Sequence, residues 1–127
     1  MSIPVHQFDS PHGRVLPRVS VLAGGDSPER EISLASGAAV AAALRELGEE
    51  VRELDPAGVR ISQCDWQPGE VALLALHGPG GEDGRIQSEL GIRGVRYTGC
   101  DVAASRRAFS KSRAKACFEL AGVPTPD

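Results

Sequence analysis

Short apolar runs alternate along this chain with longer stretches in which apolar residues recur at helical spacing. Val19, Val21 and Leu22 lie in a first run that stops at two glycines, which predicts a strand over 18–23. Further extended segments are expected at 50–54, 71–76 and 95–98. The run at 71–76 is apolar throughout, a pattern typical of a strand buried on both faces of a sheet. We therefore expect parallel strands covered by helices.

Helical spacing fills the gaps between and after these strands. The first helix is expected to follow the glycine turn, with Ser27 as its cap, Pro28 in its first position and its end at Leu47. Gly48 then provides a C-terminal stop. Later helices are expected at 84–90, 102–109 and 111–120. This alternation predicts an α/β fold, an open parallel sheet flanked by helices.

The chain divides into three expected parts. Residues 1–14 carry His, Pro and Gly without periodicity and are interpreted as a flexible leader. The α/β domain is expected over 15–110. Residues 111–127 are interpreted as the start of a further region, because 121–127 reads as a helix end that enters another extended segment.

Charge and hydropathy exclude several classes of protein. The 14 Lys and Arg against 17 Asp and Glu give a net charge of -3 without a long basic run, which argues against nucleic acid and anionic membranes as partners. The longest apolar stretches, 38–44 and 71–76, fall far short of the ~20 residues that span a bilayer. The first residues also lack a secretory segment, so a cytoplasmic protein is expected.

The three cysteines stand at widely spaced positions: Cys64, Cys100 and Cys117. Their odd number and the absence of a Cys-x-x-Cys pair suggest neither a disulfide framework nor a thiolate zinc site. They are interpreted as buried or incidental thiols, and no metal site is expected.

Two glycine-rich loops, 24–29 and 77–84, follow the first and third strands and should meet at one edge of the sheet. Both loops are acidic. They bring the carboxylates Asp26, Glu29, Glu82 and Asp83 against the cations Arg30 and Arg85. A phosphate cradle needs free backbone amides and no nearby anions, so a ligand that carries an ammonium group fits better.

Nucleotide and nucleophile motifs are missing from these loops. The first loop contains no Gly-x-Gly-x-x-Gly, and Pro28 with Glu29 would obstruct a pyrophosphate. There is no Gly-x-x-x-x-Gly-Lys-Ser/Thr, and no Ser-His-Asp or Cys-His arrangement can be argued from spacing.

Glu29 and His77 are the candidate site residues of the two loops, and each also has a structural interpretation. A carboxylate in the first turn of a helix commonly complements the helix dipole, and a histidine at a strand end can hydrogen-bond to the backbone. Their expected presence in one crevice favours a binding role. Glu82 and Asp83 are expected to cap the next helix, and Gln87 to face solvent.

Lysine is rare, since twelve of the fourteen basic residues are Arg and only Lys111 and Lys115 are Lys. Arg107, Lys111 and Lys115 follow one another at intervals of four, which predicts a shared helical face. That face could present charge to a phosphate group or form a solvated basic stripe.

Several motifs, in order, carry a resemblance to a known family. They are GGDSPEREISL at 24–34 with Ser36 and Gly37, LHG at 76–78, GEDG at 81–84 with Gln87, YTG at 97–99, Ala104 with Ser105, Lys111, and GVPTP at 122–126. Over about residues 18–127 the chain resembles the amino-terminal portion of bacterial D-alanine:D-alanine ligases, which are ATP-grasp enzymes of peptidoglycan synthesis.

The resemblance implies a Rossmann-like pre-ATP-grasp domain, with the chain ending at the start of the ATP-grasp region. Enzymes of this family use ATP to phosphorylate the carboxylate of one D-alanine, and the amine of a second attacks the acyl phosphate. By motif position, Glu29 would hold the ammonium of the first D-alanine with His77 beside it, and Lys111 would approach the nucleotide phosphates. The family usually has Asp before this lysine, where the chain has Ser110.

The resemblance also implies partners and limits. ATP and Mg²⁺ serve the complete enzyme, which is commonly a homodimer, whereas this stretch alone is expected to bind no cofactor and to be inactive. Related D-lactate and D-serine ligases share the motifs. Two alternatives outside the family stay open: a stand-alone α/β module that binds a small amino-bearing ligand, and a nucleotide-binding Rossmann domain.

Overall fold

The computed structural model describes residues 17–126, and the alternation of strands and helices is confirmed there. The elements are β1 (Val19–Leu22), α1 (Arg30–Glu46), β2 (Val51–Leu54), the short 3-10 helix η1 (Ile61–Gln63), β3 (Val71–Leu74), α2 (Arg85–Ile92), β4 (Arg96–Tyr97), α3 (Val102–Phe109) and α4 (Lys111–Leu120). Only η1 was not expected from the sequence. The predicted leader at 1–14 lies outside the described residues.

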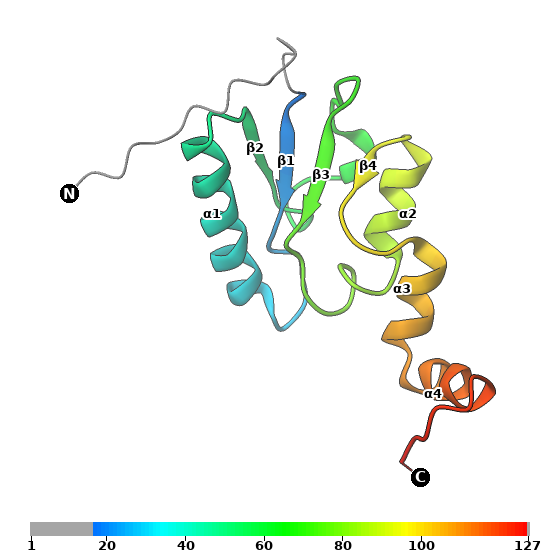
Figure 1. The fold of residues 1–127 in the computed structure, drawn as a ribbon. Helices are drawn as coiled ribbons and strands as arrows, with labels where there is room; N and C mark the ends of the chain where they lie inside the picture. Colours follow the sequence, from blue (N-terminus) through cyan, green and yellow to red (C-terminus); the bar gives the residue numbers. More distant parts are fainter. Residues whose placement is uncertain (1–16, 127) are drawn as a thin grey trace.

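The four strands form one parallel sheet in the order β2-β1-β3-β4 (Figure 1). β1 pairs with β2 and β3 in register, so that Val19 faces both Val51 and Val71. The chain therefore moves from β1 to one side of the sheet and later returns to the other side, which places a topological switch point between β1 and β3. The expected fold class, an open parallel sheet flanked by helices, is confirmed.

The sheet is buried on both faces, because neighbouring residues of a strand point in opposite directions. On one face Val21 packs with Ala41 of α1 and with Ala75. On the other face Leu22 packs with Ile61 of η1 and Leu90 of α2. Two separate hydrophobic clusters result, with the sheet between them, and this explains the apolar run in the third strand.

Helix α1 begins later than expected and packs very closely on β1. Its first residue is Arg30, because Ser27, Pro28 and Glu29 form a turn in which the Ser27 carbonyl accepts the Arg30 amide at 3.1 Å. Further along, Gly37 permits a close approach, since a Cβ there would collide with the Cβ of Ala23. The helix thus brings its N-terminus to the carboxyl end of β1.

A buried ionic network closes the opposite, amino-terminal end of the sheet. The Glu70 side chain is fully buried and forms ion pairs with Arg18 at 3.1 Å and Arg52 at 2.7 Å. The Ser20 hydroxyl donates to the same carboxylate at 2.5 Å, and Arg52 also lies over the Trp66 ring at 5.0 Å. Burial raises the pKa of Glu70, but hydrogen bonds from Arg18 and Ser20 outweigh it, and the net pKa is lowered.

The last two helices extend from the side of the sheet toward which the strands point (Figure 1). Ser110 separates them with an extended backbone, and its hydroxyl caps α4 by accepting the Arg113 amide. The prediction of one continuous face for Arg107, Lys111 and Lys115 is therefore wrong, because the break at Ser110 ends the helical spacing. No side chain of α4 is buried. Among the described residues, no helix is both long and apolar enough to cross a membrane.

Candidate functional site

The carboxyl ends of β1 and β3 lie side by side at the switch point, and the loops that follow them form the rim of the sheet. The first rim loop runs over 23–29 and the second over 75–84. Their juxtaposition, expected from the sequence, is confirmed by direct hydrogen bonds between them and to α1.

Two serine hydroxyls hold the rim loops together. Ser33 of α1 is fully buried; its hydroxyl accepts from the Gly24 amide at 2.8 Å and donates to the Ala75 carbonyl at 2.7 Å. The Ser27 hydroxyl donates to the His77 carbonyl at 2.9 Å and accepts from the Glu29 amide at 3.2 Å. Each loop therefore has a fixed position relative to the other.

The Arg30–Asp55 ion pair supports the first rim loop. The Arg30 guanidinium donates to Asp55 through both terminal nitrogens, at 3.2 and 2.6 Å, and to the Gly25 carbonyl at 2.7 Å. Asp55 also accepts the Gly25 amide at 3.0 Å. The hydrogen bond from Arg30, with those from the Gly25 and Ala57 amides, lowers the pKa of Asp55 to about 2. This carboxylate is used to shape the loop.

Two carboxylates of the second rim loop are also structural. Asp83 accepts the Gly80 and Arg85 amides, both at 3.0 Å, and so caps α2 as expected. Burial raises its pKa, but these backbone hydrogen bonds outweigh that effect and the net pKa is lowered. Glu82 does not cap the helix; it accepts the Gly78 amide at 2.7 Å instead.

The prediction that Gln87 faces solvent is wrong. Its side chain is buried, and its amide nitrogen donates to the Gly81 carbonyl at 2.9 Å. Gln87 thus supports the second rim loop from helix α2, which begins directly after that loop.

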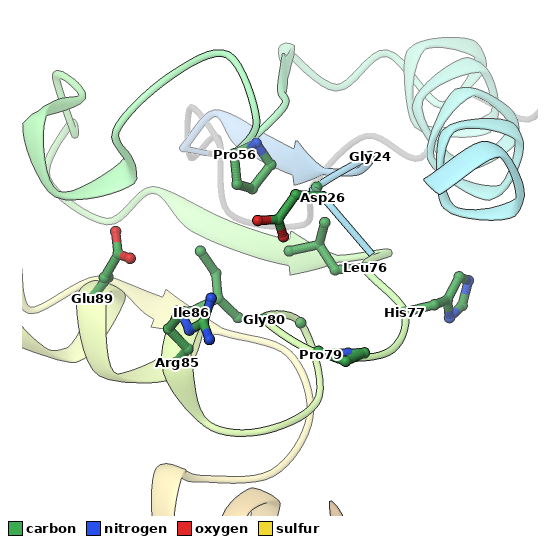
Figure 2. A pocket seen from close by; sticks show the side chains of 12 residues that line it. Gly24, Asp26, Pro56, Leu76, His77, Pro79, Gly80, Arg85, Ile86 and Glu89 are labelled. Atoms are coloured by element: carbon green, nitrogen blue, oxygen red, sulfur yellow. The ribbon is translucent and has the colours of Figure 1, made fainter. Parts of the chain in front are cut away.

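A pocket of about 160 Å³, here called the rim pocket, opens between the two rim loops and α2 (Figure 2). Its polar side chains come from three directions. Asp26 belongs to the first rim loop, and Arg85 and Glu89 lie one helical turn apart on α2. Leu76 and Ile86 supply apolar surface. Glu89 was missed by sequence analysis, although its interval of four from Arg85 is a signal that places both on one face of a helix.

Glu29 and His77 meet at the second rim loop, but only His77 lines the rim pocket. The Glu29 carboxylate lies against Gly78, so closely that a Cβ on this glycine would collide with it. The His77 ring points away from Asp26 and Arg85 (Figure 2), and its Nε2 is buried without a hydrogen-bond partner among the described residues. The structure thus brings Glu29 and His77 close together at Gly78, and of the two only His77 lines the rim pocket.

The third candidate residue, Lys111, is exposed at the first position of α4 and does not line the rim pocket. Of the three predicted site residues, Glu29 and His77 lie near each other. Lys111 is not part of that arrangement.

The rim offers poor conditions for a phosphate. The amides of Gly24 and Gly25 are bonded to Ser33 and Asp55, and the Gly80 amide is bonded to Asp83. These N–H groups are therefore not free to bind an anion. Within residues 17–126 there is also no group of three His, Cys, Asp or Glu side chains suited to a metal ion. The thiols of Cys64, Cys100 and Cys117 are free.

Known proteins similar to this chain are D-alanine ligases. No family model matches the sequence. The D-alanine--D-alanine ligase of Marinobacter nauticus is 48% identical over 113 residues, which cover 89% of this chain and 35% of that protein. The D-alanine--D-alanine ligase of Gloeobacter violaceus is 46% identical, with 86% of this chain and 36% of that protein covered. The chain thus spans about a third of the length of the curated relatives it matches.

Solved structures give the same result. D-alanyl-alanine synthetase A from Vibrio cholerae matches 90% of this chain with a TM-score of 0.79 at 25% identity, and the match covers 40% of that chain. D-alanine--D-alanine ligase from Bacillus anthracis, in complex with ATP, matches 87% of this chain with a TM-score of 0.72 at 29% identity, covering 38% of that chain. The resemblance to D-alanine:D-alanine ligases is confirmed by sequence and by fold.

Proposed function

We propose that this chain is the amino-terminal, substrate-side part of an enzyme that joins two D-alanines with ATP. The relatives named D-alanine--D-alanine ligase support the activity, and the fraction of their length that this chain spans supports a partial contribution. The division at about residue 110 into a substrate-side domain and the start of an ATP-grasp region belongs to the same proposal. So do a cytoplasmic location, a role in peptidoglycan synthesis and a homodimer.

The observation that carries the proposal is the state of the Glu29 carboxylate. Glu29 is exposed at the N-terminus of α1 and forms no side-chain hydrogen bond to cap that helix. Asp55, Glu82 and Asp83, by contrast, are all bonded to the loops that they shape. The Glu29 carboxylate holds no loop or helix end in place and lies against the backbone of a glycine. It is therefore available to bind the ammonium group of a small amino acid.

His77 would form the neighbouring wall of this amino-acid site. Ser27 fixes the His77 backbone relative to Glu29, because its hydroxyl bonds both the His77 carbonyl and the Glu29 amide. The buried Nε2 of His77 lacks a hydrogen-bond partner among the described residues, and an unsatisfied polar atom of this kind calls for a functional explanation. These two side chains bind and orient the first D-alanine.

ATP and Mg²⁺ would supply the phosphoryl group and neutralise its charge. Among the described residues, Lys111 is the candidate for the phosphates, because the amides of the rim glycines are already bonded. The exposed ammonium of Lys111 suits that role. The remaining contacts to the nucleotide and the metal would come from the portion of the enzyme that the relatives have and this chain does not span.

A chimaera tests the proposal. Residues 17–126 replace the matching third of the Marinobacter nauticus ligase, and D-alanine-dependent phosphate release from ATP is measured. The chimaera should turn over, and Glu29→Gln should lower kcat/KM for the first D-alanine by about 100-fold, because a charged hydrogen-bond partner of the ammonium is lost. Glu31→Gln, which removes the same charge two residues further along in the first turn of α1, should leave the rate within about twofold.

The same assay can overturn the proposal. Full activity in the Glu29→Gln chimaera would refute the role of Glu29. An active chimaera that prefers D-lactate or D-serine as the second substrate would keep the fold assignment and change the product. An inactive parent chimaera that folds, together with D-alanine binding by the isolated chain, would favour the stand-alone binding module.

A further inference from the structure

A second cavity, here called the α3 cavity, lies between the second rim loop, the loop after β4 and the helices α2 and α3. Its volume is about 440 Å³, and Leu74 and Phe109 contribute apolar surface to it. It shares Leu76 and Gly81 with the rim pocket and is otherwise lined by different residues. The loop after β4 carries the chain into α3, which packs beside α2 (Figure 1). The proposed function gives this space no role.

Gln87 brings an unsatisfied hydrogen-bond acceptor to the wall of the α3 cavity. The residue is only 5% exposed, and its amide nitrogen donates to the Gly81 carbonyl at 2.9 Å. Because a carbonyl oxygen can only accept, this bond fixes which end of the side-chain amide carries the oxygen. That oxygen, Oε1, has no partner among residues 17–126. A buried acceptor without a partner is costly, so a ligand group that donates an N–H is expected here.

The polar groups around Gln87 favour a basic donor over an acidic one. Glu82 also lines the α3 cavity, and its carboxylate accepts the Gly78 amide at 2.7 Å through one oxygen. The Thr98 hydroxyl oxygen accepts the Leu74 amide at 3.0 Å. A carboxylate in the wall of a cavity attracts an ammonium group and repels an anion. An arm that ends in an amine therefore suits this cavity.

Cys100 places an accessible thiol at the same cavity, directly before the N-cap of α3. No atom from another part of the described chain lies within 4 Å of the point where a Cβ would stand on Gly99, so the approach to Cys100 is open. The other thiols have different surroundings. Cys117 is exposed on α4, which buries no side chain, and the Cys64 thiol donates to the Arg60 carbonyl at 3.4 Å. Cys100 thus combines an exposed thiol with a cavity wall that holds an unsatisfied acceptor.

We propose that Cys100 is a modification site that forms a mixed disulfide with a small aminothiol, whose arm enters the α3 cavity and donates an N–H to Oε1 of Gln87. The Cys100 thiolate attacks one sulfur of the low-molecular-weight disulfide of that thiol. A new S–S bond forms, the old one breaks, and the departing thiolate takes a proton from water. One disulfide replaces another, so no separate oxidant is consumed. The extent of modification therefore follows the ratio of disulfide to thiol around the protein.

Disulfide exchange with cystamine, the disulfide of cysteamine, tests the inference. The full 127-residue chain is equilibrated with cystamine and cysteamine at several ratios, and peptide mapping by mass spectrometry gives the fraction of mixed disulfide at each cysteine. The exchange constant at Cys100 should exceed that at Cys117 by about tenfold, because the arm at Cys100 gains a charge-assisted hydrogen bond. In concentrated urea the two constants should become equal, because unfolding removes the cavity.

Two further disulfides separate the effect of the N–H from that of the charge. Oxidised thiocholine is the fully N-methylated form of cystamine, and it keeps the positive charge without an N–H. Dithiodipropionate carries a carboxylate in place of the amine. Neither disulfide should prefer Cys100 over Cys117, because neither can donate an N–H to Gln87.

Variants of α2 test the acceptor itself. Gln87→Met keeps the length of the side chain and removes the acceptor, so the exchange constant of cystamine at Cys100 should fall to about that at Cys117. The control is Glu89→Gln on the same helix. It removes a carboxylate that lines the rim pocket and not the α3 cavity, so the preference for Cys100 should stay unchanged. If Gln87→Met does not fold, the comparison of cystamine with oxidised thiocholine in the parent chain still decides the inference.

Equal exchange constants of cystamine at Cys100 and Cys117 in the folded chain would overturn the inference. So would a preference of oxidised thiocholine for Cys100 as large as that of cystamine, or a preference of cystamine that survives in folded Gln87→Met. None of the residues assigned to the proposed ligase site lines the α3 cavity, so these results leave the proposed function untouched.

Discussion

The two ends of the sheet use charged residues in opposite ways. At the amino-terminal end, Glu70 is buried and bonded to Arg18, Arg52 and Ser20. At the carboxyl-terminal rim, Asp26, Glu29 and Arg85 are exposed and take part in no ion pair among the described residues. Removing a buried charge partner is costly, whereas an exposed unpaired charge contributes little to folding. This difference distinguishes the charges that stabilise the fold from those that are available to bind a ligand.

The largest effect is expected from breaking the buried network. Glu70→Gln removes the charge that two arginines share, and the free energy of unfolding should fall by about 3 kcal/mol. Urea denaturation measures it. The control is Glu53→Gln, whose partner Arg45 is as exposed as Glu53 itself, and it should cost less than about 0.5 kcal/mol. Equal losses in the two variants would remove the distinction between the ends of the sheet.

The next largest effect concerns the rim backbone. Gly78 has φ +69°, and Gly78→Ala would also drive a Cβ into the Glu29 carboxylate. A loss of about 1–2 kcal/mol is expected from the left-handed backbone, together with displacement of Glu29. Gly91→Ala, within α2 and without neighbours, should be neutral or stabilising. Equal melting temperatures of both variants and the parent chain would contradict the left-handed backbone at Gly78 and its close contact with Glu29.

A smaller and pH-dependent effect is expected at Asp55, the one rim carboxylate that holds an ion pair. Its pKa is lowered from 3.8 to about 2, so the charged form is favoured by folding. The stability it contributes is present above pH 4 and is lost as the pH falls toward 2. Asp55→Asn should cost about 1 kcal/mol at pH 6, after allowance for solvent screening, and progressively less as the pH falls. A difference that persists unchanged to pH 2 would contradict this assignment.

The smallest effect is expected from the free rim charges. Glu29→Gln and Arg85→Gln should each change the free energy of unfolding by less than about 0.5 kcal/mol, since neither side chain forms an ion pair among residues 17–126. Thermal melts at pH 7 would show it. A loss of 2 kcal/mol in either variant would mean that the rim charges also hold the fold.

Local sequence patterns were sufficient to predict the parallel sheet and the two rim loops. The apolar run in the third strand predicted burial on both faces, and the glycines after the first and third strands predicted the two rim loops. Asp83 was predicted as a cap of α2 because the cap and the capped amide are neighbours in sequence. Each of these features depends on residues close together in the chain.

Features that depend on distant residues could not be predicted. The partners of Glu70 lie 18, 50 and 52 residues away, and Glu70 itself stands alone in a polar turn. Nor does spacing reveal that the Glu29 carboxylate lies against Gly78, or that Gln87 turns inward to the Gly81 carbonyl. A shared face for Lys111 and Arg107 failed because one extended residue, Ser110, resets the helical phase.

Helix α4 contacts α3 but buries none of its own side chains, and Leu120 is 91% exposed. Its amide protons should therefore exchange with deuterium through local opening, long before those of β1, whose exchange requires the whole sheet to unfold. Any polypeptide or nucleotide that settles on α4 will slow that exchange without altering the rate in β1. Hydrogen exchange in α4 therefore reports binding to this helix separately from the stability of the sheet.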